Sequence, residues 1–154
     1  MKAVIQRVSG ASVTVDGKVV GKIDKGFMIL FGAAEGDTSE DIAVLAKKTV
    51  NLRIFKDSDD KMNLSLLDID GEALVVSQFT LCADLKKGNR PSFINAMKPE
   101  MASEYYDEYC KQLHELGVKK VEKGIFGADM QVSLVNDGPV TILYDTEIWR
   151  KNGN

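Results

Sequence analysis

The chain has 154 residues, of which 44% are hydrophobic and 28% are charged, and its formal net charge is −3. These values are typical of a globular protein, so we expect residues 1–154 to form one domain. The negative charge argues against a protein that coats nucleic acid through charge alone, although it is compatible with binding one RNA end through a few phosphate contacts. The sequence has no apolar run of membrane-spanning length and no signal peptide at its start, so no membrane partner is expected.

The counts of cysteine and histidine limit the chemistry further. Cys82 and Cys110 make a poor disulfide framework, which favours a reducing, cytoplasmic setting. His114 is the only histidine, so a Ser-His-Asp or Cys-His mechanism would have to use it. Cys110 and His114 are four residues apart on a predicted helix, but two ligands without a further histidine leave a metal site incomplete.

The N-terminal part predicts a series of strands. The first strand is predicted at residues 1–8. A β-hairpin is predicted around the turn pair Asp16-Gly17, with its strands at 11–15 and 18–23. The continuous apolar run at 26–33 predicts a central strand. We therefore expect an antiparallel, β-rich opening.

A helix is predicted to follow, with Thr38 able to cap its first N–H groups. One face of this helix carries Ile42, Leu45, Ala46 and Thr49 at helical spacing. Residues 52–55 predict a short strand. The polar loop at 56–62 lacks the ligand spacing of an EF-hand and predicts a solvated turn rather than a calcium site.

A second helix is predicted between Pro99 and Gly117, residues that suit a helix start and the position after a helix end. His114 lies off its apolar stripe and is expected to face solvent rather than to act in catalysis. The stripe itself comprises Ala102, Tyr105, Tyr109, Leu113 and Leu116.

Further strands are predicted at 118–123, 131–135 and 141–145, and residues 147–154 form a polar tail that we expect to fray. Many strands with two helices predict one compact α/β domain in which sheet layers are backed by helices.

Two segments carry chemical groups at strand ends. The apolar run 72–76 predicts a buried strand that ends abruptly in Ser77-Gln78-Phe79-Thr80-Leu81. Such a tip presents hydroxyls, an amide and backbone N–H groups that the strand ladder does not use. A second break, Asn136-Asp137-Gly138-Pro139-Val140-Thr141, separates two later apolar runs.

Together these segments resemble the paired signature of the D-aminoacyl-tRNA deacylases, the D-tyrosyl-tRNA deacylase family. In that family the signature is a Ser-Gln-Phe-Thr-Leu segment and a Gly-Pro-Val-Thr segment, and both stand unaltered here. The resemblance extends from Gln6-Arg7-Val8 to the final strand. It implies a deacylase-type β/β/α fold of mostly antiparallel sheet layers backed by two main helices. It also implies a homodimer whose two active sites are completed across the subunit interface.

The implied activity is hydrolysis of the ester of D-aminoacyl-tRNA to free D-amino acid and tRNA, a proofreading step of translation. The partner would be the tRNA 3′ end, and no metal or other cofactor is implied. A related enzyme that removes L-alanine has altered signature residues, whereas Ser77-Gln78-Phe79-Thr80 has the D-specific form. The rival interpretation is a non-catalytic module of the same fold that binds a tRNA end or a protein.

The candidate catalytic residues are Ser77, Gln78, Phe79 and Thr80. Ester hydrolysis needs a positioned water and donors aimed at the developing oxyanion, which this tip can supply. Thr80 as a nucleophile would need an adjacent base, and none is near in sequence, so we favour attack by water that Thr80 orients. Thr80 as nucleophile is the alternative. The resemblance implies that the ribose 2′-hydroxyl of the substrate assists.

The candidate substrate-binding residues are Gly138, Pro139, Arg7, Phe126 and Met130. The resemblance implies a cis Gly138–Pro139 bond whose carbonyls project into the neighbouring subunit's site and exclude an L side chain. Glycine has no side chain to exclude, so glycyl-tRNA, including glycine mischarged on tRNA-Ala, is an expected substrate. Arg7 is expected to hold these carbonyls with its fork of N–H groups. The terminal adenine is expected near Phe126 and Met130, which otherwise read as core residues.

The loop around Lys86, Lys87 and Arg90 leaves two interpretations open. A basic loop is often only solvated, but three cations beside Pro91-Ser92-Phe93 could also contact phosphates.

Overall fold

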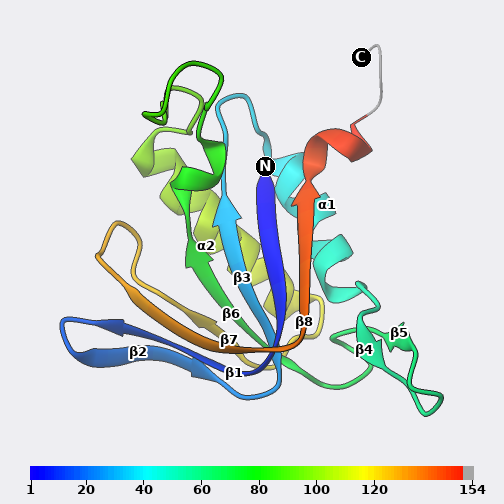
Figure 1. Ribbon diagram of the computed structural model, residues 1–154. Helices are drawn as coiled ribbons and strands as arrows, with labels where there is room; N and C mark the ends of the chain where they lie inside the picture. The colour runs from blue at the N-terminus through cyan, green and yellow to red at the C-terminus, as the bar shows by residue number, and fades with distance from the viewer. Residues whose placement is uncertain (151–154) are drawn as a thin grey trace.

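The computed structural model describes residues 1–150 (Figure 1). Its organising element is β1 (Lys2–Val15), which pairs antiparallel with β8 (Gln131–Asp145) along one edge. On the other edge β3 (Gly26–Gly32) pairs with its first half and β2 (Lys18–Ile23) with its second half. The segments 1–8 and 11–15, expected as separate strands, are therefore one strand, while the hairpin turn at Asp16-Gly17 is confirmed.

The sheet is mixed: most of its pairing is antiparallel, as expected, through the contacts of β1 with β2, β3 and β8, and the rest is parallel. β6 (Glu72–Ser77) runs parallel to β3, and β7 (Val121–Lys123) runs parallel to β6. The chain crosses through α1 (Ser39–Val50) between β3 and β6, and through α2 (Pro99–Glu115) between β6 and β7. Connections that carry a helix across one face of a sheet bring successive strands back in the same direction, which explains the parallel pairs.

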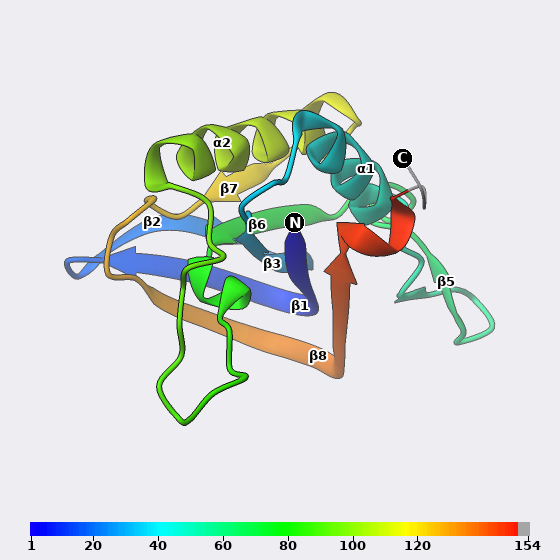
Figure 2. The ribbon, with the colours of Figure 1, turned by 90° about the horizontal axis from the view of Figure 1, so that it is seen from above.

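Both helices cover the same face of the sheet (Figure 2). Thr38 is the N-cap of α1, as predicted, and forms a capping box with Asp41, whose carboxylate accepts the N–H of Thr38 at 2.8 Å. The predicted face of α1 is buried, but the stripe of α2 differs from the expectation. Tyr106 is 1% exposed and its hydroxyl donates to the carbonyl of Val75 at 2.6 Å, whereas Leu116 is 41% exposed because α2 ends before it.

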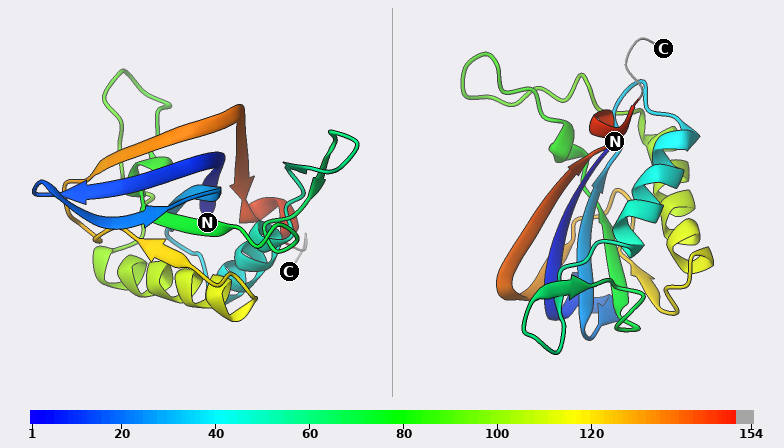
Figure 3. Two further views of the ribbon diagram at one scale, coloured as in Figure 1. Left: turned by 90° about the horizontal axis from the view of Figure 1, so that it is seen from below. Right: turned by 90° about the vertical axis from the view of Figure 1, so that its right-hand side faces the viewer.

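A second sheet layer lies on the opposite face. The second half of β1, the first half of β8 and β2 curve over β3 and β6, as the view from below shows (Figure 3, left). Between the layers lies a small core, composed of Val8, Ala11, Val13, Ile23, Met28, Leu74 and Val76. β6 is therefore buried on both faces, which accounts for its unbroken apolar run. The compact α/β domain with two helices is confirmed.

β8 contains the Gly-Pro segment without ending there. Gln6 pairs with Thr141 and Val8 pairs with Asn136, so residues 137–140 of β8 face Arg7 alone. The extra residues leave the ladder as an irregularity, and the strands expected at 131–135 and 141–145 form one bent strand. The predicted separation into two strands was wrong because the pairing with β1 resumes on both sides of the irregularity.

The remaining elements are short. β4 (Phe55–Lys56) and β5 (Met62–Leu64) form a hairpin around the polar loop. Of the tail expected to fray, residues 147–149 belong to the 3₁₀ turn η2 (Thr146–Trp149), and residues 151–154 lie outside the described part. Within residues 1–150, no helix combines the length and the apolar character needed to cross a membrane.

Candidate active site

The first signature segment forms a tight turn at the tip of β6. Ser77 is the last residue of the strand, the N–H of Gln78 donates to the carbonyl of Phe31 at 2.7 Å, and the 3₁₀ turn η1 (Phe79–Cys82) follows. Gly32 on β3 permits this close approach, because a Cβ there would lie 2.9 Å from the carbonyl oxygen of Gln78. In residues 1–150 no hydrogen bond uses the N–H groups of Phe79 and Thr80, as expected for the first residues of a helical turn.

A cleft of about 660 Å³ opens beside this turn. Ser77, Gln78 and Phe79 line it together with Phe126 and Met130, which the loop between β7 and β8 contributes. The structure thus brings together residues from both sequence predictions, the strand tip and the adenine pocket. The rest of the lining is mostly apolar, comprising Phe31, Gly32, Ala33, Val76, Phe93, Ala96, Met97, Lys98, Pro99, Ala102, Gly127, Ala128 and Val132.

The cleft lining offers no general base. Lys98 is its only ionisable side chain, and the hydroxyl of Thr80, just outside the lining, accepts a hydrogen bond from the amide of Gln78. His114 is exposed, bonds the carbonyl of Val118 at 3.0 Å and lines a separate hollow beside β7, as predicted for a residue outside the site.

Neither thiol is poised as a nucleophile. Burial raises the pKa of Cys82 and raises that of Cys110 to about 12, so both are thiols at neutral pH. Within the described residues, no three or more histidine, cysteine or acidic side chains gather as metal ligands would.

The Gly-Pro segment lies away from this cleft. The peptide bond between Gly138 and Pro139 is cis, and both residues are exposed. Arg7 pairs with Phe27 and Ser77 pairs with Phe31 on the same strand, β3. These two positions on β3 are four residues apart, which is about 13 Å along the strand. Gly138, Pro139 and Arg7 therefore do not meet Ser77, Gln78 and Phe79 within one subunit.

Arg7 holds the Gly-Pro segment, but through a different carbonyl from the one expected. The side chain is only 5% exposed. Its Nε donates to the carbonyl of Asp137 at 2.8 Å, and its Nη1 donates to that of Ile54 at 2.7 Å. Arg7 faces the start of the four-residue irregularity, so Asp137 is the carbonyl that its fork contacts. The side-chain oxygen of Asn136 accepts the N–H of Val140 at 2.8 Å and closes the segment from the other side.

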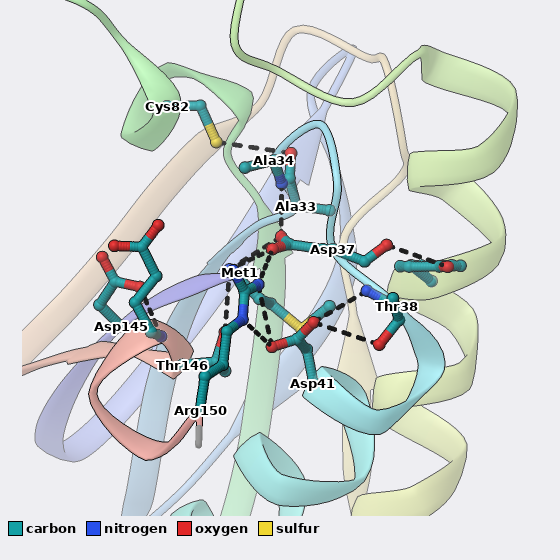
Figure 4. A network of polar contacts seen from close by, with 12 residues as sticks. Met1, Ala33, Ala34, Asp37, Thr38, Asp41, Cys82, Asp145, Thr146 and Arg150 are labelled. Atoms are coloured by element: carbon teal, nitrogen blue, oxygen red, sulfur yellow. Dashed lines mark hydrogen bonds and ion pairs between the residues drawn. The ribbon is translucent and has the colours of Figure 1, made fainter. Parts of the chain in front are cut away.

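A buried ionic network contacts Ala34, next to the cleft-lining Ala33 (Figure 4). The α-amino group of Met1 donates to Asp37 at 2.8 Å and to the hydroxyl of Thr146 at 3.1 Å. The same carboxylate accepts the N–H of Ala34 at 2.7 Å. The adjacent Ala33 lines the cleft, and its carbonyl accepts the thiol of Cys82 and the N–H of Met97. The sequence marked Asp37 only as part of a helix start, because its partners lie far away along the chain.

Asp41 extends the network toward the C-terminal turn. Arg150 donates to Asp37 at 2.7 Å and to Asp41 at 3.1 Å. Burial raises the pKa of Asp41, but hydrogen bonds from Thr38, Thr146 and Arg150 outweigh burial and hold the pKa below its usual value. A carboxylate with a lowered folded pKa adds stability that is complete above about pH 4 and is lost as the pH falls through the folded pKa.

Replacing Asp37 with asparagine should lower the free energy of unfolding by about 3 kcal/mol, because a buried ammonium group loses its charge partner. The side chains of Met1 and Asp37 are 0% and 3% exposed, so water cannot compensate. Urea denaturation at pH 7 measures the change. Asp60→Asn is the matched control, since that carboxylate is 81% exposed in its pair with Lys56. Equal stabilities of the two variants would contradict a bracing role for Asp37.

Comparison with known proteins agrees with this geometry. The D-Tyr-tRNA(Tyr) deacylase family profile matches residues 4–145. A D-aminoacyl-tRNA deacylase of Flavobacterium psychrophilum is 61% identical over 148 residues, which cover 96% of this chain and 98% of that protein.

Two solved structures share the fold. One is described as a c-Myc DNA unwinding element binding protein, with a TM-score of 0.90, 42% identity and coverage of 94% of this chain and 98% of that one. The other is described as a probable eukaryotic D-amino acid tRNA deacylase, with a TM-score of 0.78 and coverage of 93% and 97%. At 18% identity this second likeness concerns the fold alone. The family match spans most of the chain, so the chain belongs to the D-Tyr-tRNA(Tyr) deacylase family, and the enzyme class expected from its two signature segments is confirmed.

Proposed function

We propose that this protein hydrolyses the ester of D-aminoacyl-tRNA and releases the D-amino acid and tRNA in the cytoplasm. The observation that carries the proposal is the turn at Gln78 and Phe79, which sets unpaired backbone N–H groups beside a mostly apolar cleft. A cleft of about 660 Å³ is within the usual range for a site that binds a small organic group. The aminoacylated terminal adenosine of tRNA is such a group.

In this proposal the adenine enters the apolar part of the cleft. Phe126 and Met130 pack against the base, in the way that apolar side chains hold unstacked bases of RNA ends. The ester carbonyl then faces the strand tip, where the N–H groups of Phe79 and Thr80 stabilise the oxyanion. Water attacks the carbonyl carbon with help from the ribose 2′-hydroxyl, because the cleft lining supplies no histidine, carboxylate or thiolate base.

The selection of the D-isomer is proposed to come from a second subunit. Gly138 and Pro139 are exposed and lie about 13 Å along β3 from Ser77, so they can complete the cleft of another copy rather than their own. Their rigid carbonyls would bind the substrate's α-amino group and leave no room for an L side chain. Glycyl-tRNA, including glycine mischarged on tRNA-Ala, would be hydrolysed because glycine has no side chain to exclude.

Subunit mixing tests the cross-subunit site. Gln78→Ala/Phe79→Ala damages the strand tip and Gly138→Ala damages the Gly-Pro segment, so each homodimer should be nearly inactive on D-tyrosyl-tRNA. Co-expression should restore about a quarter of the wild-type sites, because half of the dimers are mixed and each mixed dimer has one intact site. If the two segments acted within one subunit, no site would be restored.

Replacing Thr80 with alanine should lower kcat about tenfold and leave tRNA affinity unchanged. This is the expected cost of losing one orienting hydrogen bond near 1.4 kcal/mol. Single-turnover hydrolysis of D-tyrosyl-tRNA measures it. His114→Ala, outside the site, should match the wild type. Complete loss of hydrolysis with retained tRNA binding would instead identify Thr80 as the nucleophile.

A non-catalytic nucleic-acid-binding module is the second candidate. The reason to test it is the solved structure with 42% identity, which is described as a c-Myc DNA unwinding element binding protein. The two candidates differ in turnover: a binding module retains tRNA without releasing the amino acid, whereas a deacylase releases it repeatedly.

A further inference from the structure

The loop between η1 and α2 projects from the body (green in Figure 2), and its second half, including Phe93 and Lys98, lines the cleft. Residues 85–99 carry four basic side chains and no acidic one, namely Lys86, Lys87, Arg90 and Lys98. The rest of the chain holds all 23 acidic residues and only 16 of the 20 basic ones. In a protein of net negative charge, residues 85–99 thus form a positively charged segment, and Lys98 of this segment lines the cleft.

These four cations are not neutralised by neighbouring carboxylates. Within residues 1–150 none of them makes an ion pair. The lysines on the opposite side of the fold differ, because Lys111, Lys119 and Lys120 pair with Glu115, Asp70 and Glu72. Of the acids beside the loop, Asp84 is engaged by the loop backbone, since its carboxylate accepts the N–H of Lys86 at 3.0 Å. In the described part of the chain, Glu35 and Glu100 make no ion pair with the four cations.

The base of the loop is fixed to the site. Asp84 and Ser92 exchange two backbone hydrogen bonds of 2.7 and 3.0 Å, and the N–H of Glu35 donates to the carbonyl of Asn95 at 2.8 Å. Phe93 lines the cleft and packs edge-on against Phe79, with ring centroids 5.0 Å apart. Lys98 also lines the cleft. One of the four cations therefore lies at the place proposed for the terminal adenosine, and the other three lie on the loop that is fixed beside it.

We propose that Lys86, Lys87 and Arg90 bind backbone phosphates of the tRNA 3′ end while Lys98 contacts the phosphate nearest the cleft. The inference rests on the proposed function, because it takes the terminal adenosine to occupy the cleft. An RNA strand that leaves the cleft over Phe79 and Phe93 carries one phosphate per nucleotide past these side chains. Phe79 is 57% exposed, and its ring offers a face on which a base can stack, as in other sites that bind single-stranded nucleic acid.

Such contacts would not depend on base sequence, so the loop would serve many different tRNAs. Each phosphate contact on a single strand contributes about 0.7 to the slope of log affinity against log salt concentration. The three contacts of Lys86, Lys87 and Arg90 give a slope near 2, so these side chains alone should raise the wild-type KM about twentyfold between roughly 50 and 200 mM salt.

The test compares two triple variants that lower the net charge equally. Lys86→Ala/Lys87→Ala/Arg90→Ala removes the loop cations, and Lys111→Ala/Lys119→Ala/Lys120→Ala removes cations distant from the cleft. Each is assayed on D-tyrosyl-tRNA and on 3′-O-D-tyrosyl-adenosine, an ester without phosphates. The loop variant should show at least a tenfold higher KM for tRNA at low salt and a flatter salt dependence, with kcat for either substrate unchanged. The control should match the wild type.

Three outcomes would overturn the inference. Equal KM values for tRNA in the loop variant and the wild type would remove the loop from tRNA binding and leave the deacylase proposal intact. An equal loss on the adenosine ester would mean that the loop acts on the catalytic site rather than on phosphates. If the wild type hydrolyses neither ester, the proposed function fails; filter binding of uncharged tRNA then decides, and equal affinities of both triple variants would overturn the phosphate surface.

Discussion

Gly138→Ala should lower kcat/KM for D-tyrosyl-tRNA by at least about a hundredfold while the protein stays folded. Gly138 has a φ of +141°, which an L side chain rarely adopts, and a Cβ would lie 2.9 Å from Cγ2 of Val140 and 3.0 Å from Nη2 of Arg7. The segment must therefore move, and a displacement of about 1 Å in a group that positions substrate can cost about a hundredfold. The exposed site should let the fold tolerate the change.

Gly17→Ala is the matched control for this variant. Gly17 also has a positive φ, +78°, but no atom lies within 4 Å of the Cβ position in the β1–β2 turn. It should cost about 1 kcal/mol of stability and leave kcat/KM unchanged. Steady-state kinetics on D- and L-tyrosyl-tRNA separate the effects. Wild-type turnover and wild-type discrimination in folded Gly138→Ala would remove the Gly-Pro segment from the mechanism.

Arg7→Ala should lower both activity and stability, by about a hundredfold in kcat/KM and about 2–3 kcal/mol in the free energy of unfolding. The substitution leaves the carbonyls of Asp137 and Ile54 without their donor, and the side chain that it removes is 95% buried. Loss of the Asp137 contact frees the segment that carries Gly138 and Pro139. The activity loss is therefore expected even at temperatures where the variant is folded.

Two comparisons separate positioning from general destabilisation. Arg53→Ala removes an exposed arginine that donates to the carbonyl of Asn63. This variant should change neither kcat/KM nor the free energy of unfolding by much. The double variant Arg7→Ala/Gly138→Ala should lose no more activity than the worse single variant, because both act through one segment. Additive losses, or a folded Arg7→Ala protein with wild-type kcat/KM, would contradict the positioning role.

Local sequence signals predicted the elements that are determined locally. The Asp16-Gly17 turn, the cap at Thr38 and the strand that ends at Ser77 all follow from a few adjacent residues. The continuity of β8 did not, because the Gly-Pro pair breaks the local pattern while pairing with β1 maintains the strand on both sides. The parallel pairs were also missed. The direction of a strand depends on how the connecting helix crosses the sheet, which the residues of the strand do not show.

The site was predicted in its parts but not in its arrangement. Ser77, Gln78 and Phe79 were marked by polar groups at a strand end, and the cleft joins them to Phe126 and Met130 from a loop about 50 positions later. Nothing local indicated that Arg7 would be buried or that its partner would be Asp137. The network of Met1, Asp37 and Arg150 joins both ends of the described chain, a contact that no periodicity can reveal.

The proposed reaction is a chirality-selective hydrolysis that needs no catalytic metal. Its most direct test is the deacylation of matched D- and L-tyrosyl-tRNA by the purified protein in the presence of a chelator. We expect rapid release of D-tyrosine and no acceleration of L-tyrosine release over the uncatalysed rate. Hydrolysis of both esters at similar rates, or of neither by a folded protein that still binds tRNA, would contradict it.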